Sequence, residues 1–218
     1  ITPQSGAAFT FKKTAGIAGI APECTNATTI KVPRNTAIRY CYTVVNTGSV
    51  TFTTHSLVDS HLGVLLNRVN HLLLPGSVFS TTKTSPITVN TTNVATWTAS
   101  VDVVAAANPI DLLAGEEAQA NTSATVIISS DSDDQDSDTI PDNIETADDP
   151  DHDNLPNFLD TDDDGDGKLD IDEVGSDPLH PLDLNNNNIP DYLDATPTAS
   201  EESDEPQQRR VYLPLIGR

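Results

Sequence analysis

Oxygen-bearing side chains recur at alternate positions in four stretches of the latter part of the chain. The clearest stretch begins at Asp183, and positions 1, 3, 5, 9 and 12 counted from there are all Asp or Asn. This is the ligand spacing of twelve-residue calcium loops, in which alternate side chains converge on one ion and position 7 lends its backbone carbonyl. Asn188 stands at position 6, where the chain needs a positive φ that asparagine tolerates.

The same frame fits three more times, and we number the loops one to four along the chain. Position 6 is Thr139, Asn154, Gly167 and Asn188 in turn, and Thr139 is the least suitable of these. Counting position 7 for its backbone oxygen, the predicted metal ligands are Asp134, Asp136, Asp138, Ile140, Asp142 and Glu145; Asp149, Asp151, Asp153, Leu155, Asn157 and Asp160; Asp162, Asp164, Asp166, Lys168, Asp170 and Glu173; and Asp183, Asn185, Asn187, Ile189, Asp191 and Asp194.

A competing interpretation is that this acidic stretch is a disordered, solvated tail. Each loop, however, has an apolar residue at position 7 or 8, which a random acidic tail would not have; they are Ile140, Leu155, Leu169 and Ile189. Calcium takes six to eight oxygen ligands, and clustered carboxylates repel one another without an ion. We therefore expect an ordered segment with Ca²⁺ as its cofactor.

Helical EF-hands are excluded because three residues separate loops one and two, and one residue separates loops two and three. Pro141, Pro156 and Pro190 at position 8 also lack the N–H that would pair two such loops. Residues 131–195 resemble thrombospondin type 3 repeats, including the spacer from Gly175 to Pro178. The resemblance implies a nearly coreless extracellular module in which neighbouring loops can share ions. The cysteines of that family are missing here.

The charge is distributed very unevenly along the chain. The net charge is −22, yet residues 1–130 are nearly neutral, and Lys168 is the sole base between 131 and 208. Phosphate backbones would be repelled, so nucleic acid is not expected as a partner. No apolar run approaches the length of a membrane span.

Residues 1–130 are punctuated by Gly and Pro and alternate between apolar and polar residues, as β-strands do. Ile38, Tyr40, Tyr42 and Val44 share one face of a predicted strand, and Trp97 is the predicted central core residue. Further strands are expected near 9–12, 29–32, 50–53, 78–83, 93–101 and 124–129. The pattern predicts a mainly β chain: an immunoglobulin-like β-sandwich, then a helix-poor segment of calcium loops and a short C-terminal strand.

An ordered set of short motifs in this half resembles the bacterial surface-repeat family known as domain of unknown function 11. The set comprises 40–48 (Tyr-Cys-Tyr-Thr-Val-Val-Asn-Thr-Gly), 56–59 (Ser-Leu-Val-Asp), 73–76 (Leu-Leu-Pro-Gly) and 93–99 (Asn-Val-Ala-Thr-Trp-Thr-Ala). The resemblance covers roughly residues 5–130. It implies a structural, extracellular role with no catalytic residues.

A short polar segment contains the residue types of a nucleophilic triad: His55, Ser56, Asp59, Ser60 and His61. Neighbours on one strand alternate faces and cannot all converge, whereas triads assemble from distant segments. We interpret these residues as solvated strand positions, and we expect no enzyme.

Cys24 and Cys41 are the two cysteines, and an even count favours a disulfide over a metal or redox pair, which would need a CxxC motif or a histidine partner. Sequons at Asn26, Asn90 and Asn121 predict glycosylation. A chain that starts at Ile1 without a signal peptide suggests a mature form. We expect a secreted, cell-surface protein.

Residues 196–208 form a predicted polar linker, and 209–218 a predicted strand. Its docking residues would be Val211, Tyr212, Leu213, Leu215 and Ile216. The segment either folds back on its own sandwich, serves as a sorting tag, or docks on the next copy by strand addition. The last interpretation predicts a head-to-tail homopolymer, a calcium-stiffened surface fibre or layer. The alternatives are an adhesin or carbohydrate-binding module with glycans as partners, and an enzyme accessory fragment.

Overall fold

The computed structural model describes residues 6–22, 24–101 and 115–196. The predicted C-terminal strand with Val211, Tyr212, Leu213, Leu215 and Ile216 lies outside the described residues. The strands are β1 (Phe9–Ile17), β2 (Thr29–Val32), β3 (Ala37–Asn46), β4 (Phe52–Asp59), β5 (Gly63–Leu73), β6 (Val78–Pro86), β7 (Thr91–Ser100) and β8 (Glu117–Ile128).

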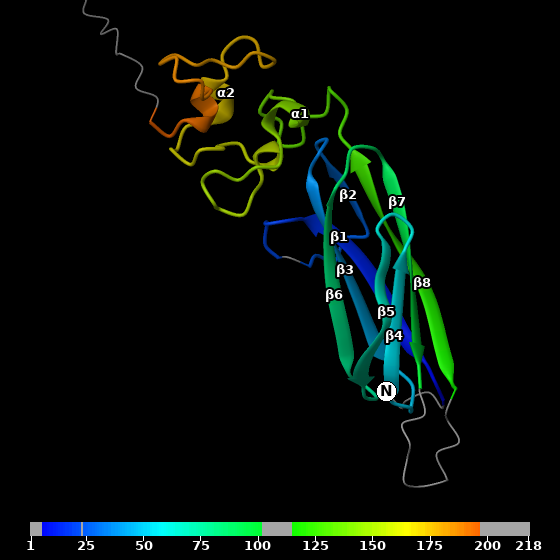
Figure 1. Cartoon of the computed structure of the whole chain (residues 1–218). Coiled ribbons are helices and arrows are strands. Elements are labelled where there is room, and N and C mark those ends of the chain that lie inside the picture. Colours follow the sequence, from blue (N-terminus) through cyan, green and yellow to red (C-terminus); the bar gives the residue numbers. More distant parts are fainter. Residues whose placement is uncertain (1–5, 23, 102–114, 197–218) are drawn as a thin grey trace, which may run out of the picture.

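These strands form two sheets that enclose one core as a β-sandwich (Figure 1). The smaller sheet has the order β1-β3-β6, and the larger has the order β2-β8-β7-β4-β5. Neighbouring strands are antiparallel, except that β2 runs parallel to β8. The mainly β architecture predicted from the sequence is confirmed.

Alternating side chains of β3 and β7 build the centre of the core. Ile38, Tyr40, Tyr42 and Val44, predicted to share a face, are each 0% exposed, and so is Trp97. Burying apolar side chains of this kind contributes ~1.5–3 kcal/mol each. This inward face therefore drives the association of the two sheets.

The expectation that the polar residues of β4 are solvated is wrong for His55 and Asp59, which are 0% and 2% exposed. The Trp97 indole N–H donates to His55 Nδ1 over 3.2 Å, and His55 Nε2 lies 3.1 Å from the carbonyl oxygen of His71. Burial lowers the pKa of His55 below its usual value, which keeps the ring neutral. This histidine is a packing partner of Trp97.

Strand β5 was not expected from the sequence. Its register against β4 shifts at three points, so its side chains do not follow a regular alternation. Val64 and Leu72 on this strand are 64% and 67% exposed. Among the described residues β5 pairs only with β4, so it forms an exposed and partly apolar edge of the larger sheet.

Cys24 and Cys41 form the predicted disulfide, with Cα atoms 5.8 Å apart. The bond links the segment before β2 to β3. The two cysteines are 17 residues apart in sequence. Closing a loop of about this length stabilises the fold by on the order of 3 kcal/mol, because it restricts the unfolded chain.

Each acidic loop ends in one helical turn that begins at position 9. The turns are α1 (Asp142–Glu145), η1 (Asn157–Leu159), α2 (Asp170–Glu173) and η2 (Asp191–Leu193). In three loops a proline directly precedes the turn, where its missing N–H removes no helical hydrogen bond. None of the helices in the described ranges is long and apolar enough to cross a membrane.

The acidic segment packs against one end of the sandwich (Figure 1). Phe158 of loop two is 1% exposed and belongs to the core cluster of the sandwich. Polar contacts add to this junction: Lys31 Nζ pairs with Asp133 Oδ1 at 2.5 Å, and Asn143 Oδ1 accepts from the Arg34 backbone N–H at 3.2 Å. The loops and the sandwich therefore share apolar packing as well as chain connectivity.

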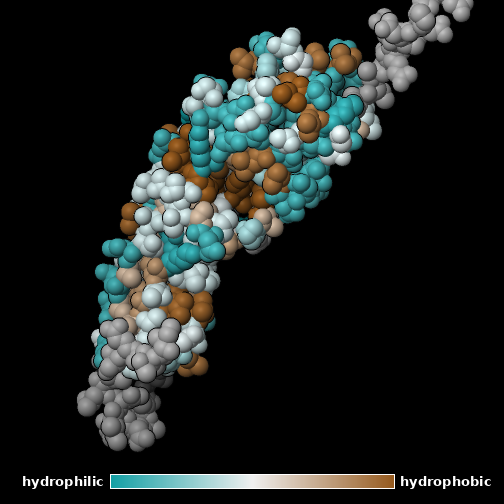
Figure 2. Space-filling model, turned by 180° about the vertical axis from the view of Figure 1, so that it is seen from behind, coloured by the Kyte–Doolittle hydropathy of each residue, from teal (hydrophilic) through white to brown (hydrophobic). Residues whose placement is uncertain are grey.

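A mostly apolar hollow of about 300 Å³ lies beside this junction. Figure 2 shows it as a brown-lined recess between the acidic end and the sandwich. Its apolar lining includes Ile17, Ile20, Pro22, Ile30, Leu155 and Phe158.

We predict that Phe158→Ala destabilises the sandwich by about 3–5 kcal/mol, since it leaves a cavity in the shared core. Leu159→Ala, at a neighbouring position that is 39% exposed, is the matched control and should have a much smaller effect. Denaturant unfolding followed by Trp97 fluorescence measures both. Equal effects of the two substitutions would contradict the shared core.

Candidate metal centre

The four acidic loops have the same backbone conformation. Position 6 has a positive φ in every loop, as expected from the sequence, and so does position 4, which the sequence did not reveal. The φ angles at position 4 are 70° (Ser137), 66° (His152), 69° (Gly165) and 57° (Asn186); at position 6 they are 90° (Thr139), 77° (Asn154), 95° (Gly167) and 70° (Asn188). Thr139 adopts this conformation although it is β-branched, so loop one is folded like the others.

Hydrogen bonds between side chains and backbone repeat in the same way. In every loop the position-3 side-chain oxygen accepts from the backbone N–H of position 5, at 2.9–3.3 Å. The position-5 oxygen accepts from the N–H of position 7, at 2.6–2.8 Å. Turns of this type are a local property of Asx residues. One oxygen of each side chain is thereby fixed, and the second atom is left for the interior of the loop.

Three clusters of carboxylates result, and within each the candidate ligand atoms lie within 4.8 Å of one another. The clusters are Asp134, Asp136 and Asp138; Asp149, Asp151 and Asp153; and Asp162, Asp164 and Asp166. They coincide with positions 1, 3 and 5 of loops one, two and three. Of the side chains that the spacing predicted to converge, these clusters bring together those at positions 1, 3 and 5 of loops one to three.

Many of these oxygens are buried and have no hydrogen-bond partner. They include both carboxylate oxygens of Glu145 at position 12 of loop one, and one oxygen of Glu173 at position 12 of loop three. The others at predicted ligand positions belong to Asp136, Asp138, Asp149, Asn157, Asp162, Asp164 and Asp170. An ionised carboxylate buried without a partner is strongly unfavourable, so each oxygen is suited to a bound cation.

The raised pKa values of several carboxyl groups in the loops also favour a bound cation. Burial, followed by repulsion from Asp138 and Asp136, raises the pKa of Glu145 to about 10. Burial also raises the pKa of Asp136 and of Asp170 to about 7, with neighbouring carboxylates adding to both shifts. Lys168, whose side chain is 57% exposed, reaches Glu173 Oε1 at 3.1 Å. One exposed ammonium cannot neutralise clusters of this size.

Asp163 is a candidate ligand that the sequence analysis missed. It occupies position 2 of loop three, is 1% exposed, and has both oxygens buried without a partner. Burial and then repulsion from Asp170, Asp160, Asp138 and Asp136 raise its pKa to about 9. Asp138 and Asp136 belong to loop one, so Asp163 lies where loops one and three meet. The available signal was the run of three aspartates from 162 to 164.

The residue at position 9 forms further hydrogen bonds, which join the end of each loop to its beginning. Its backbone N–H donates to the carbonyl of the residue before the loop in all four cases, at 2.7–3.0 Å. Its carboxylate also accepts from the position-2 N–H in loops one, three and four. Loop two has Pro150 at position 2, which offers no N–H, and Asn157 at position 9. Loop two thus lacks both groups of this hydrogen bond: the N–H at position 2 and the carboxylate at position 9.

Loop four differs from the other three. Asn185 Nδ2 and Asn187 Nδ2 both donate to Asp194 Oδ2, each at 2.9 Å. The two amides therefore satisfy the position-12 carboxylate, whereas its counterparts Glu145 and Glu173 keep unpartnered oxygens. Loop four was predicted to bind metal like the others, but it can hold its conformation with less help from a cation.

The loops also have a small apolar core of their own, contrary to the expectation of a nearly coreless string. Ile140, Val174 and Tyr192 are at most 2% exposed and pack together. They come from loop one, the end of α2 and η2, so the cluster holds loops one, three and four against one another. Of the apolar residues at positions 7 and 8, only Ile140 is buried; Leu155, Leu169 and Ile189 are 43%, 48% and 45% exposed.

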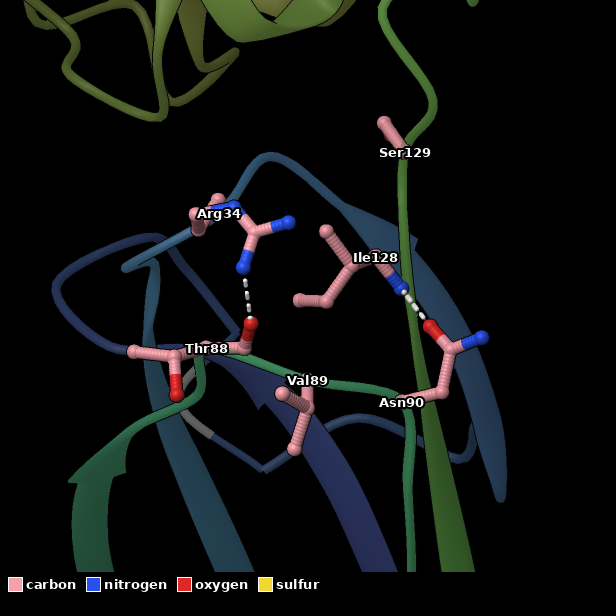
Figure 3. Close-up of a pocket in the computed structure, with 6 residues that line it drawn as sticks. All are labelled: Arg34, Thr88, Val89, Asn90, Ile128 and Ser129. Carbon is pink, nitrogen blue, oxygen red and sulfur yellow. Dashed lines mark hydrogen bonds between the residues drawn. The ribbon is translucent and has the colours of Figure 1, made fainter.

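Asn26, Asn90 and Asn121, the sequon asparagines, are all exposed. Asn90 Oδ1 accepts from the Ile128 N–H at 2.7 Å, beside Arg34, whose Nη1 donates to the Thr88 carbonyl at 2.6 Å. Figure 3 shows these contacts around a pocket at one end of the sandwich, lined by the β2–β3 and β6–β7 connections and the end of β8. The exposure of the three sequon asparagines is compatible with glycosylation, which stays a prediction.

Comparison with known proteins gives little further information. No protein-family model and no curated protein matches the chain. Among solved structures, the chain is similar to the CARDB domain of the PF1109 protein from Pyrococcus furiosus in complex with di-metal ions, at 12% identity and a TM-score of 0.33, over 58% of this chain and 91% of that one. It is also similar to the putative ApaA protein from Bordetella pertussis, at 19% identity and a TM-score of 0.33, over 56% and 96%. Similarities at this level carry no argument about function, and both sequence resemblances remain predictions.

We predict that, in chelator, the acidic segment becomes less stable as the pH rises. A carboxyl whose folded pKa is raised stabilises the fold below its unfolded pKa of about 4, and this contribution is lost as pH rises through the folded value. For Asp164, Asp136 and Asp170, the pH range over which this stabilisation is lost extends up to their folded pKa values of about 6, 7 and 7. Proteolysis of residues 131–195 should therefore accelerate from roughly pH 5 to pH 8. A stability that rises over this range would contradict the model of repelling carboxylates.

We predict that Glu145→Gln makes the segment more protease-resistant in chelator. The pKa of Glu145 is raised to about 10, so folding at neutral pH requires this carboxyl to bind a proton, and Gln is neutral without that cost. The substitution should also reduce the additional resistance gained from a divalent cation. Asp172→Asn removes a charge at an exposed position outside the predicted ligand set and is the matched control. Limited proteolysis with and without the cation measures both effects. Identical responses of the two variants would exclude Glu145 from the site.

Proposed function

We propose that this chain is a calcium-stabilised extracellular structural protein, a subunit of a bacterial cell-surface fibre or layer that assembles head to tail. One observation carries the proposal. Loops one to three, fixed by the same backbone hydrogen bonds as loop four, hold buried carboxylate oxygens without partners, and loop two is anchored in a β-sandwich. A cation that fills the loops would convert a self-repelling segment into a stiff extension of the sandwich.

Calcium is the ion best suited to these donors. The three clusters consist of aspartates alone, without His or Cys, and carboxylate and carbonyl oxygens favour hard cations over zinc or copper. Extracellular calcium modules bind at about 10⁻⁴–10⁻³ M, which suits a structural ion outside the cell. The Cys24–Cys41 disulfide supports an oxidising compartment.

A catalytic role has no support in the polar segment of β4. The ring nitrogens of His55 contact Trp97 and the His71 carbonyl, and Asp59 pairs with Lys13. Ser56 Oγ accepts from the Arg68 N–H. These residues do not form a nucleophile and its base, so we propose a non-enzymatic role.

The alternative, a carbohydrate-binding module, would need an exposed aromatic platform. In the part of the chain that the structure describes, the exposed large apolar side chains are all Val, Leu or Ile. Trp97, Tyr40, Tyr42 and Tyr192 are buried. The structural role is therefore better supported than the binding module.

Assembly would use the C-terminal segment 209–218 as a strand added to an exposed edge of a second copy. Strand β5 offers such an edge, because within the described ranges it pairs on one side only and exposes Val64, Val69 and Leu72. Pro214 in the added strand is tolerable at an edge, where one missing donor is not needed. A donor at one end and an acceptor elsewhere form a heterologous contact that propagates into an open fibre.

We predict that deletion of residues 209–218 leaves a folded protein with unchanged calcium response that no longer polymerises. A tail of equal length with Leu213→Asp and Ile216→Asp should behave like the deletion, whereas Arg218→Ala should polymerise normally. Electron microscopy of the purified proteins, with calcium and with chelator, measures fibre formation. Unchanged fibres after the deletion would contradict head-to-tail assembly through this segment.

A further inference from the structure

A buried polar cluster lies between the two sheets of the sandwich, remote from the acidic loops. Lys13 comes from β1, Asp59 from the end of β4 and Asn93 from β7, and they are 0%, 2% and 0% exposed. Tyr40 and Tyr42 of β3, both 0% exposed, enclose the lysine. The proposed structural role uses none of these residues, although burying a charged lysine is unfavourable unless it is paired.

The lysine amine is held against both Asp59 and Asn93. Lys13 Nζ donates to Asp59 Oδ2 at 2.9 Å and to the backbone carbonyl oxygen of Asn93 at 2.9 Å. It also lies 4.7 Å from the ring centroid of Tyr40 and 5.4 Å from that of Tyr42. The amine is therefore fixed next to Asn93 in a site that excludes water.

The side-chain amide of Asn93 is arranged as an electrophile. Its Oδ1 accepts a hydrogen bond from Ser60 Oγ at 3.3 Å, which draws electron density away from the amide carbon. Its Nδ2 is buried against the hydroxyl of Tyr40, and neither group makes a hydrogen bond of regular geometry. The nitrogen that would leave is thus held less firmly than the amide oxygen.

The protonation states also favour reaction. Burial lowers the pKa of Lys13, and the hydrogen bond and charge of Asp59 only partly oppose this, so the neutral amine needed for attack is more accessible than in water. Burial alone would raise the pKa of Asp59, but hydrogen bonds from Tyr42, Lys13 and two backbone N–H groups lower it overall. Asp59 is therefore a carboxylate in contact with the ammonium whose proton must be removed.

We propose that Lys13 and Asn93 become joined by an isopeptide bond, with Asp59 as the proton carrier. Asp59 accepts a proton from the Lys13 ammonium, and the neutral Nζ attacks Cγ of Asn93. The Cγ–Nδ2 bond then breaks, Nδ2 departs as ammonia with the second proton of the amine, and Asp59 releases its proton to the ammonia. The lysine ammonium and the asparagine amide thus yield one secondary amide and one ammonium ion, without an oxidant or a cofactor.

A simple ion pair between Lys13 and Asp59 is the competing explanation. It accounts for the 2.9 Å contact, but it leaves the buried amide nitrogen of Asn93 with only an irregular contact to the Tyr40 hydroxyl. The reaction removes that nitrogen and converts the buried ammonium into a neutral amide. The bond would tie β1 of the smaller sheet to β7 of the larger one, so that the two sheets could not separate when the molecule is pulled.

The mass of the purified full chain tests this directly. We would express it in a host that does not N-glycosylate, reduce the disulfide and denature the protein before intact mass spectrometry. The expected mass is one ammonia below that of the sequence, with a branched tryptic peptide that contains Lys13 and Asn93. Lys13→Arg, Asn93→Ala and Asp59→Ala should have the unmodified mass, whereas Lys12→Arg, at the exposed neighbouring lysine, should keep the loss.

The unsubstituted chain decides the outcome even if a variant fails to fold. An unmodified mass would overturn the proposal. Loss of ammonia without a branched peptide would indicate a cyclised asparagine and would also overturn it. Loss of water with a branched peptide joining Lys13 to Asp59 would assign the bond to the wrong partner and overturn the role of Asn93.

Discussion

Repulsion between carboxylates held close together is the constraint on which the acidic segment depends. The backbone of each loop is locally determined, because short side chains bond to N–H groups two residues ahead. These bonds fix the turns and at the same time direct further oxygens toward one another. Local structure and electrostatic repulsion thus have the same origin. The folded segment can relieve the repulsion by binding protons, in line with its raised pKa values, or by binding the divalent ion proposed above.

The sandwich deals with buried polarity in a different way. Its core contains His55 against Trp97, and Asp59 against Lys13 and Tyr42. In these pairs of the sandwich core, each buried hydrogen-bond acceptor faces a side-chain donor. The loop clusters, in contrast, consist of carboxylates, which are acceptors only. Replacing one partner of such a pair leaves the other buried and unpaired, which is more damaging than the pair is stabilising. The cluster therefore fixes which strands face each other.

The features that could be predicted are those with a short period in sequence. The alternation in β3, the core position of Trp97 and the spacing of the loop side chains depend on neighbours a few residues apart, and each is found as expected. The positions of Asp163, Phe158 and Lys13 depend on contacts between remote segments. Lys12 and Lys13 are adjacent in sequence, yet one is exposed and the other is 0% exposed. Strand β5 was missed for a related reason, because its register shifts against β4 interrupt the period that marks a strand.

Phe158 lies well beyond β8, the last strand of the sandwich, which ends at Ile128. During synthesis all eight strands leave the ribosome before this ring does, so the nascent sandwich has a gap in its core until loop two emerges. Closure of that gap requires loop two to fold, and loop two is rich in carboxylates. The calcium binding proposed for loop two would thereby tie maturation of the neutral half to the ionic conditions that its acidic extension meets.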